Sequence, residues 1–239
     1  MFRKIPECVH LVNDYLCLNN RIGNNGFYAL SDDALSYVLH HLVPFERPDM
    51  YAVLDDKLLL LEHFAFDASK HSRKGMHGFR NESEIHEKMN QLNPGEELLV
   101  KTDYSVSIQD WQDNFNRIFS SHYTKIDDYI DNVKLQVENP SEKEIVTGFF
   151  VENPFPPYLN IGRKIYDIPY IFTTQFQSKF IESPKLDFLL YGCYYNGKPQ
   201  IFYADKKSWE KIENLIDLSD PNVTLSGLNA NEVVWGCRF

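Results

Sequence analysis

The sequence predicts an α/β fold in which helices flank a mixed sheet, and three observations predict it. Two apolar strand patterns come as a pair at 50–54 and 58–66, with the second continuously apolar at its start. Such a run is typical of a strand covered on both faces. A long helical pattern covers 109–136, and a stretch of β-branched and aromatic residues follows at 145–153. Strands that alternate with helical segments indicate a sheet with helices packed on it.

The N-terminal elements follow from capping and turn signals. Ser31 precedes two aspartates and a run of apolar residues at helical spacing, which predicts a helix over 31–42. Asp55-Asp56-Lys57 forms a tight turn between the two strands at 50–66, so we expect a hairpin there. The polar, glycine-containing stretch 67–82 predicts a loop.

The remaining elements rest on the same kinds of pattern. Within 109–136, apolar and aromatic residues recur every three or four positions, which predicts one long helix. Asn196-Gly197 is a strong hairpin signal. The other expected elements are a helix at 81–92, a short strand at 96–106, a helix at 172–183, paired strands within 186–205 and a helix at 207–218. We expect a single domain over 1–239, with a core at about 31–205 and elaborations at both ends.

Composition limits the classes of function. The net charge of −10 argues against broad, nonspecific binding to DNA, because phosphate contacts need a basic face. The four cysteines have no zinc or redox spacing, and no apolar run is long enough to span a membrane. The start of the sequence has no apolar core of a signal peptide. We therefore expect a cytoplasmic protein with no membrane partner.

Two carboxylates stand out on the predicted hairpin. Asp49 follows Pro48 just before the first strand, and Glu62 lies near the end of the second. Neighbouring strands can bring such residues together, and Mg²⁺ needs only one or two carboxylates because it keeps several waters. The alternative is structural: Asp49 caps a turn, and Glu62 marks the point where the strand reaches water. Glu152, at another strand end, could approach Glu62, but the pattern favours a solvated strand end.

Pro48-Asp49, Glu62 thirteen residues later and the order of elements over roughly 31–205 resemble the PD-(D/E)xK nuclease superfamily, which has the restriction-endonuclease-like fold. The resemblance implies that Asp49 and Glu62 bind Mg²⁺ or Mn²⁺ and are catalytic. It also implies a lysine two residues after the glutamate, where this sequence has Phe64. Lys70 and Lys74 are the nearest substitutes, so the chain resembles a divergent member that lacks the usual lysine.

Basic residues gather just past the second strand. Lys70, Arg73, Lys74 and Arg80 form the densest positive segment of an acidic chain, and they are the candidate nucleic-acid contacts. A solvated surface loop is the alternative explanation for the same residues.

Two functions therefore stay open. The first is a Mg²⁺-dependent nuclease, or a nuclease-derived protein that binds nucleic acid. The second is a non-enzymatic protein that binds a protein partner on the same scaffold, since the acidic charge and the missing lysine suit that role. Homo-oligomerisation through the aromatic C-terminal hairpin is a further alternative.

Overall fold

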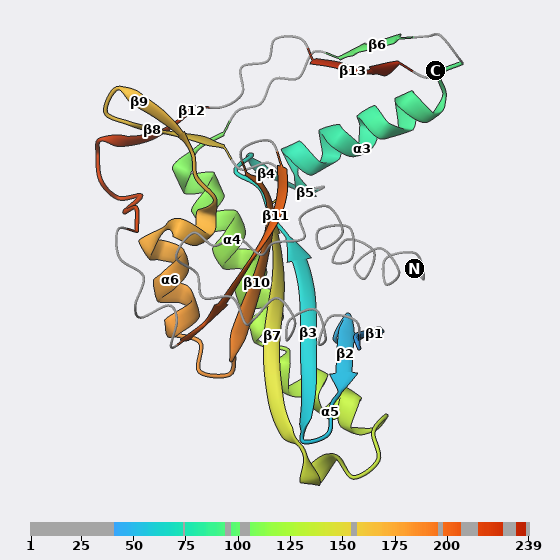
Figure 1. The fold of residues 1–239 in the computed structure, drawn as a ribbon. Helices are drawn as coiled ribbons and strands as arrows, with labels where there is room; N and C mark the ends of the chain where they lie inside the picture. Colours follow the sequence, from blue (N-terminus) through green and yellow to red (C-terminus); the bar gives the residue numbers. More distant parts are fainter. Residues whose placement is uncertain are drawn as a thin grey trace.

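A six-stranded mixed sheet is the centre of the structure (Figure 1). The computed structural model describes residues 41–73, 75–93, 97–100, 106–153, 157–195, 198–206, 215–226 and 233–237. In spatial order the strands are β1 (Val43–Pro44), β2 (Met50–Val53), β3 (Lys57–Ala65), β7 (Glu144–Asn153), β10 (Phe188–Tyr195) and β11 (Lys198–Asp205). β3, β7 and β10 are parallel, and the other pairs are antiparallel. The predicted α/β class with a mixed sheet is thus confirmed.

Three helices pack on one face of this sheet: α4 (Ile108–Tyr123), α5 (Ile126–Lys134) and α6 (Thr174–Ile181). Phe66, just past β3, meets Phe115 of α4 with ring centroids 5.2 Å apart. Phe176 of α6 meets Tyr191 of β10 at 5.6 Å. The parallel strands β3, β7 and β10 follow one another in one direction across the sheet. When the connections between such strands are right-handed, their helices lie on the same face, as observed. In the described part of the chain, the helices on the sheet therefore cover one face rather than both.

Smaller elements surround the main sheet. A three-stranded sheet has the order β12 (Val223–Ser226), β8 (Tyr158–Ile161) and β9 (Lys164–Asp167), and β6 (Glu97–Val100) pairs with β13 (Val233–Cys237). Two further strands, β4 (His71–Ser72) and β5 (Gly75–Met76), form a short hairpin before α3 (His77–Asn90), and the 3₁₀ turns are η1 (Pro140–Glu142) and η2 (Tyr170–Phe172). In Figure 1, α3 and the β6–β13 pair lie together, away from α4 and α5.

Two sequence predictions were wrong in the helical regions. The helix expected over 109–136 is two helices, because the backbone tightens at Thr124 and Lys125, whose N–H groups bond to Ser120 and His122. The change of direction lets α5 bury Ile126 and Tyr129. The helix expected over 81–92 begins earlier, at residue 77 and inside the expected loop 67–82, after a turn in which Gly75 has φ +113°.

Several other predicted elements can be compared only in part. Residues 31–40 and 207–214 lie outside the described residues, as do 96 and 101–105 of the expected strand 96–106. Within the described residues, 41–42 and 215–218 are not helical, which contradicts the ends of the helices expected over 31–42 and 207–218. Ile216 instead forms a parallel bridge with Thr173. The hairpin strands at 50–66, the strand at 145–153, the helix within 172–183 and the paired strands within 186–205 are confirmed.

A close approach inside the sheet yields the first testable prediction. A Cβ added at Gly148 of β7 would lie 2.2 Å from the nearest ring carbon of Phe188. Gly148→Ala should lower the free energy of unfolding by about 2 to 3 kcal/mol, because the ring must leave its rotamer. Urea unfolding measures this. The double variant Gly148→Ala/Phe188→Leu should recover part of the loss, and an unchanged unfolding midpoint in the single variant would contradict the packing.

Candidate functional site

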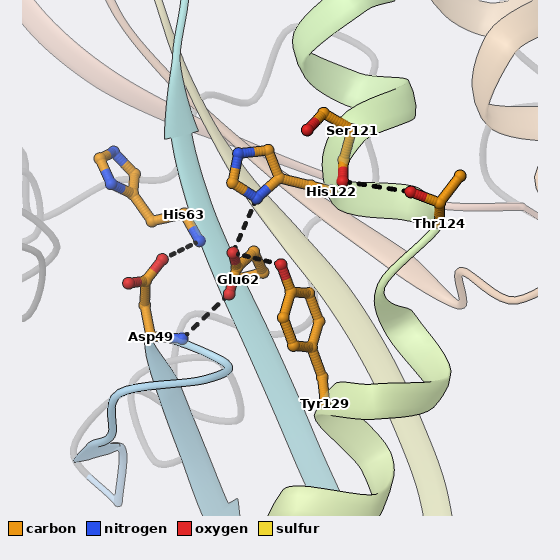
Figure 2. Close-up of polar contacts among 7 residues, drawn as sticks. All are labelled: Asp49, Glu62, His63, Ser121, His122, Thr124 and Tyr129. Carbon is orange, nitrogen blue, oxygen red and sulfur yellow. Dashed lines mark hydrogen bonds and ion pairs between the residues drawn. The ribbon is translucent and has the colours of Figure 1, made fainter.

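The hairpin brings the two predicted carboxylates together (Figure 2). Met50 faces Leu61 in the β2–β3 register, so Asp49 and Glu62 are the next facing positions. The backbone N–H of Asp49 donates to Glu62 Oε2 over 3.1 Å. The backbone N–H of His63 donates to Asp49 Oδ2 over 2.9 Å. Each carboxylate is therefore held by a backbone group of the other strand.

Two helical residues complete the surroundings of Glu62, which is only 7% exposed. The hydroxyl of Tyr129 on α5 donates to Glu62 Oε1 over 2.8 Å. His122 Nδ1 on α4 lies 2.7 Å from the same oxygen. In Figure 2 both side chains reach Glu62 from the helical side of β3. Glu62 is thus a buried, fixed carboxylate, which contradicts the alternative that it marks a strand end in water.

The electrostatics of the pair disfavour two bare negative charges. Burial, and then the negative charge of Glu62, raise the pKa of Asp49 from 3.8 to about 6, although the His63 amide hydrogen bond opposes the shift. Burial and the same negative charge raise the pKa of Tyr129 above its ordinary value. Tyr129 therefore stays protonated and keeps donating to Glu62. A site of this kind favours uptake of a proton or a cation.

The opposite face of β3 carries a second pair. His63 Nε2 lies 3.1 Å from Glu152 Oε2 of β7, and their side chains are 14% and 10% exposed. Successive residues of a strand point to opposite faces, so His63 and Glu152 lie across the sheet from the Glu62 side chain. The expectation that Glu152 is a solvated strand end was wrong, because the parallel β3–β7 register carries Glu152 alongside the buried end of β3.

The position two residues after Glu62, where the resemblance implies a lysine, holds an aromatic residue instead. Phe64 is 4% exposed, and its ring stacks on His122 with centroids 5.1 Å apart. The predicted substitute Lys70 is exposed, and within the described residues no ion pair joins it to Asp49 or Glu62. Lys74 lies outside the described residues.

The other described basic residues of the predicted segment differ in exposure. Arg73 is exposed, and Arg80 on α3 is half-buried with its Nε 3.7 Å from Glu84 Oε1. The structure adds a residue that the sequence did not single out: Arg117 Nη2 of α4 lies 3.2 Å from His71 Nδ1. Arg117 thus adds a positive charge to the basic segment, although it lies on a helix more than forty positions further along the chain.

Carboxylate oxygens are ligands that Mg²⁺ and Mn²⁺ prefer, so Asp49 and Glu62 would be the two protein ligands of such an ion. Within the described ranges, no group of three or more His, Cys, Asp or Glu side chains could hold a metal ion. Two carboxylates are enough for an ion that keeps several waters. The other oxygen of Asp49, Oδ1, has no hydrogen-bond partner among the described residues. Glu62 also keeps lone pairs, since an ionised carboxylate offers about four acceptor sites.

Comparisons of the chain with known proteins gave no match: no family model, curated protein or solved structure matches the chain. Among the described residues, none of the helices has both the length and the apolar character needed to cross a membrane.

Removing the Tyr129 hydroxyl tests the support of Glu62. Tyr129→Phe should lower the free energy of unfolding by about 1.5 kcal/mol at pH 7, since a buried carboxylate loses one charged hydrogen bond. Chemical denaturation monitored by fluorescence measures it. Tyr123→Phe is the matched control. The Tyr123 hydroxyl accepts a hydrogen bond from the exposed backbone N–H of Lys185 over 3.3 Å and, among the described residues, contacts no buried charge. Equal losses in the two variants would show that Tyr129 does not hold Glu62.

Proposed function

We propose that the protein is a Mg²⁺- or Mn²⁺-dependent nuclease that cleaves phosphodiester bonds of nucleic acid, on a restriction-endonuclease-like core. The observation that carries the proposal is the Asp49–Glu62 pair, which two neighbouring strands hold through reciprocal backbone hydrogen bonds. The pair is buried enough to raise the pKa of Asp49, as expected for a site that gains from a bound cation.

The topology of the sheet supports the same proposal. After β3 come β4, β5, α3 and β6, then α4 and α5, and then β7, which is parallel to β3. The strand with Asp49, the strand with Glu62, the helical segment and the following parallel strand are the described part of the element order on which the resemblance to PD-(D/E)xK nucleases rests. Phe64 stands two residues after Glu62, so the positive charge at this site must come from another residue.

Each residue has a defined role in the proposal. A divalent ion held by Asp49 and Glu62 would neutralise developing charge on the phosphate and lower the pKa of a bound water. Tyr129 and His122 fix the orientation of Glu62, and the His63 amide fixes Asp49. Lys70 supplies the positive charge that Phe64 cannot, and Lys74 is the second candidate for that role. Among the described residues, no ion pair places Lys70 at the carboxylates, and Lys74 lies outside the described residues.

A second candidate function is protein binding without catalysis. The observation that favours it is the β8–β9 hairpin, whose outer strand exposes 68% of Ile165 and 38% of Tyr166. An edge strand with exposed apolar side chains can accept a strand from another chain. Sedimentation of the wild type and of Ile165→Asp tests whether that other chain is a second copy. A monomer in both would exclude this route to a homo-oligomer.

Cleavage assays test the leading proposal. Labelled single- and double-stranded DNA and RNA should be cut in Mg²⁺ or Mn²⁺, and EDTA should stop the reaction. Asp49→Ala should lower the rate by about 100-fold or more, because the ion that stabilises the transition state is lost. Lys70→Ala should lower the rate while leaving Mn²⁺ binding unchanged. Absence of cleavage for every substrate, or cleavage that persists in EDTA, would overturn the proposal.

A further inference from the structure

We infer that Arg117 and His71 together bind a phosphate group of the nucleic-acid strand, outside the carboxylate pair. The inference rests on the proposed function, which it deepens by naming a substrate contact. It begins from the contact between Arg117 Nη2 and His71 Nδ1 at 3.2 Å. Both residues are exposed and belong to elements distant in sequence, α4 and β4.

The chemistry of the contact fixes what the two side chains offer. A guanidinium has only donors, so His71 Nδ1 must accept this hydrogen bond and His71 Nε2 carries the ring proton. The pair therefore presents an imidazole N–H and the remaining N–H groups of a planar, permanently charged fork. That set of donors suits phosphate oxygens, which guanidinium groups bind in a bidentate manner.

The charges around the pair support binding of an anion. Lys70 and Arg73 are exposed in the same segment as His71, although the chain as a whole carries −10. The nearest acidic position on the same face of α4 is Asp113, one turn before Arg117, and it accepts a hydrogen bond from Gln109 over 2.8 Å. Within the part of the chain that the structure describes, no carboxylate forms an ion pair with Arg117.

The helix also sets the spacing between this contact and the carboxylates. His122, which touches Glu62, lies five residues after Arg117 on α4. Five residues of α-helix advance about 7.5 Å along the axis. Arg117 and the contact of His122 with Glu62 are therefore roughly one and a half helical turns apart along α4, so the phosphate held by Arg117 and His71 is distinct from one at the carboxylate pair.

Fluorescence anisotropy with a labelled 12-nucleotide single-stranded DNA, and with RNA of the same sequence, tests the inference in EDTA, where no cleavage is expected. Arg117→Ala should weaken binding by about 5- to 10-fold and lower the salt slope of the affinity by about one. Arg163→Ala is the control, because it removes the same charge from an exposed turn. It should change affinity by less than about 2-fold. Comparison of the affinities for the DNA and the RNA oligonucleotide shows which of the two nucleic acids supplies the phosphate group.

The relation between the two residues gives a second readout. His71→Ala should weaken binding as Arg117→Ala does, and the double variant should lose little more than either single variant, because the two side chains act as one unit. Equal losses in Arg117→Ala and Arg163→Ala, or wild-type protein that binds neither oligonucleotide, would overturn the inference.

Mn²⁺ binding separates this inference from the proposed function. Arg117→Ala should bind Mn²⁺ as the wild type does, because it lies outside the carboxylate pair. Intact Mn²⁺ binding together with unchanged oligonucleotide affinity in Arg117→Ala would overturn only the phosphate contact. Absence of Mn²⁺ binding to the wild type would instead count against the proposed function.

Discussion

Replacing Glu62 with alanine is expected to lower the free energy of unfolding by about 3 kcal/mol at pH 7. The change removes the acceptor of the Tyr129 hydroxyl, the Asp49 amide and His122 Nδ1, all of which meet the Glu62 carboxylate. Buried donors without an acceptor lose their hydration without compensation. Part of the loss is offset, because the negative charge that raises the pKa of Asp49 disappears. Urea unfolding at pH 7 measures the result.

A conservative variant separates the lost hydrogen bonds from lost volume. Glu62→Gln keeps one carbonyl oxygen and most of the side-chain volume, so its loss should be smaller than that of Glu62→Ala. A change below about 0.5 kcal/mol in Glu62→Ala, the size typical of an unconstrained surface residue, would contradict the buried network.

Replacing Asp49 with asparagine is expected to stabilise the metal-free protein at pH 7 by about 1 to 3 kcal/mol. The folded state raises the pKa of Asp49 to about 6 from 3.8, so it holds the proton more tightly than the unfolded chain does. The wild type therefore loses stability as the pH rises from about 4 to about 6, and the loss persists above that range. Asparagine removes the charge and keeps an oxygen that can accept the His63 N–H.

The pH dependence makes this result specific. The difference in unfolding free energy between Asp49→Asn and wild type should be near its maximum at pH 7 and should vanish below about pH 4. Urea unfolding in EDTA at several pH values measures it. Asp55→Asn removes the same charge from the exposed β2–β3 turn, and it should change the unfolding free energy by less than about 0.5 kcal/mol at either pH. A destabilised Asp49→Asn variant would show that the Asp49 charge is favourable in the fold.

Local patterns predicted the parts of the fold that local chemistry decides. The apolar run at 58–61 and the Asp55-Asp56-Lys57 turn specify a hairpin, and the hairpin alone brings Asp49 to Glu62. The break between α4 and α5 was missed, because the apolar spacing continues through Thr124 and the change of direction follows from what α5 buries.

The partners of the carboxylates could not be read from local sequence. Tyr129 is 67 positions from Glu62, and His122 is 60. Their meeting depends on how α4 and α5 pack on the sheet, and single tyrosines and histidines in a helix carry no signal of that packing. His63 and Glu152 are 89 positions apart and depend in the same way on the β3–β7 register.

Calorimetric titration of Mn²⁺ into the wild type, Asp49→Asn and Asp55→Asn tests the central claim most directly, which is that Asp49 and Glu62 hold a divalent cation. Asp49→Asn is suited to this purpose, because it should be folded and more stable than the wild type without metal. We expect binding of one ion to the wild type and to Asp55→Asn, and none to Asp49→Asn. No binding to the folded wild type, or equal binding to Asp49→Asn, would contradict the claim.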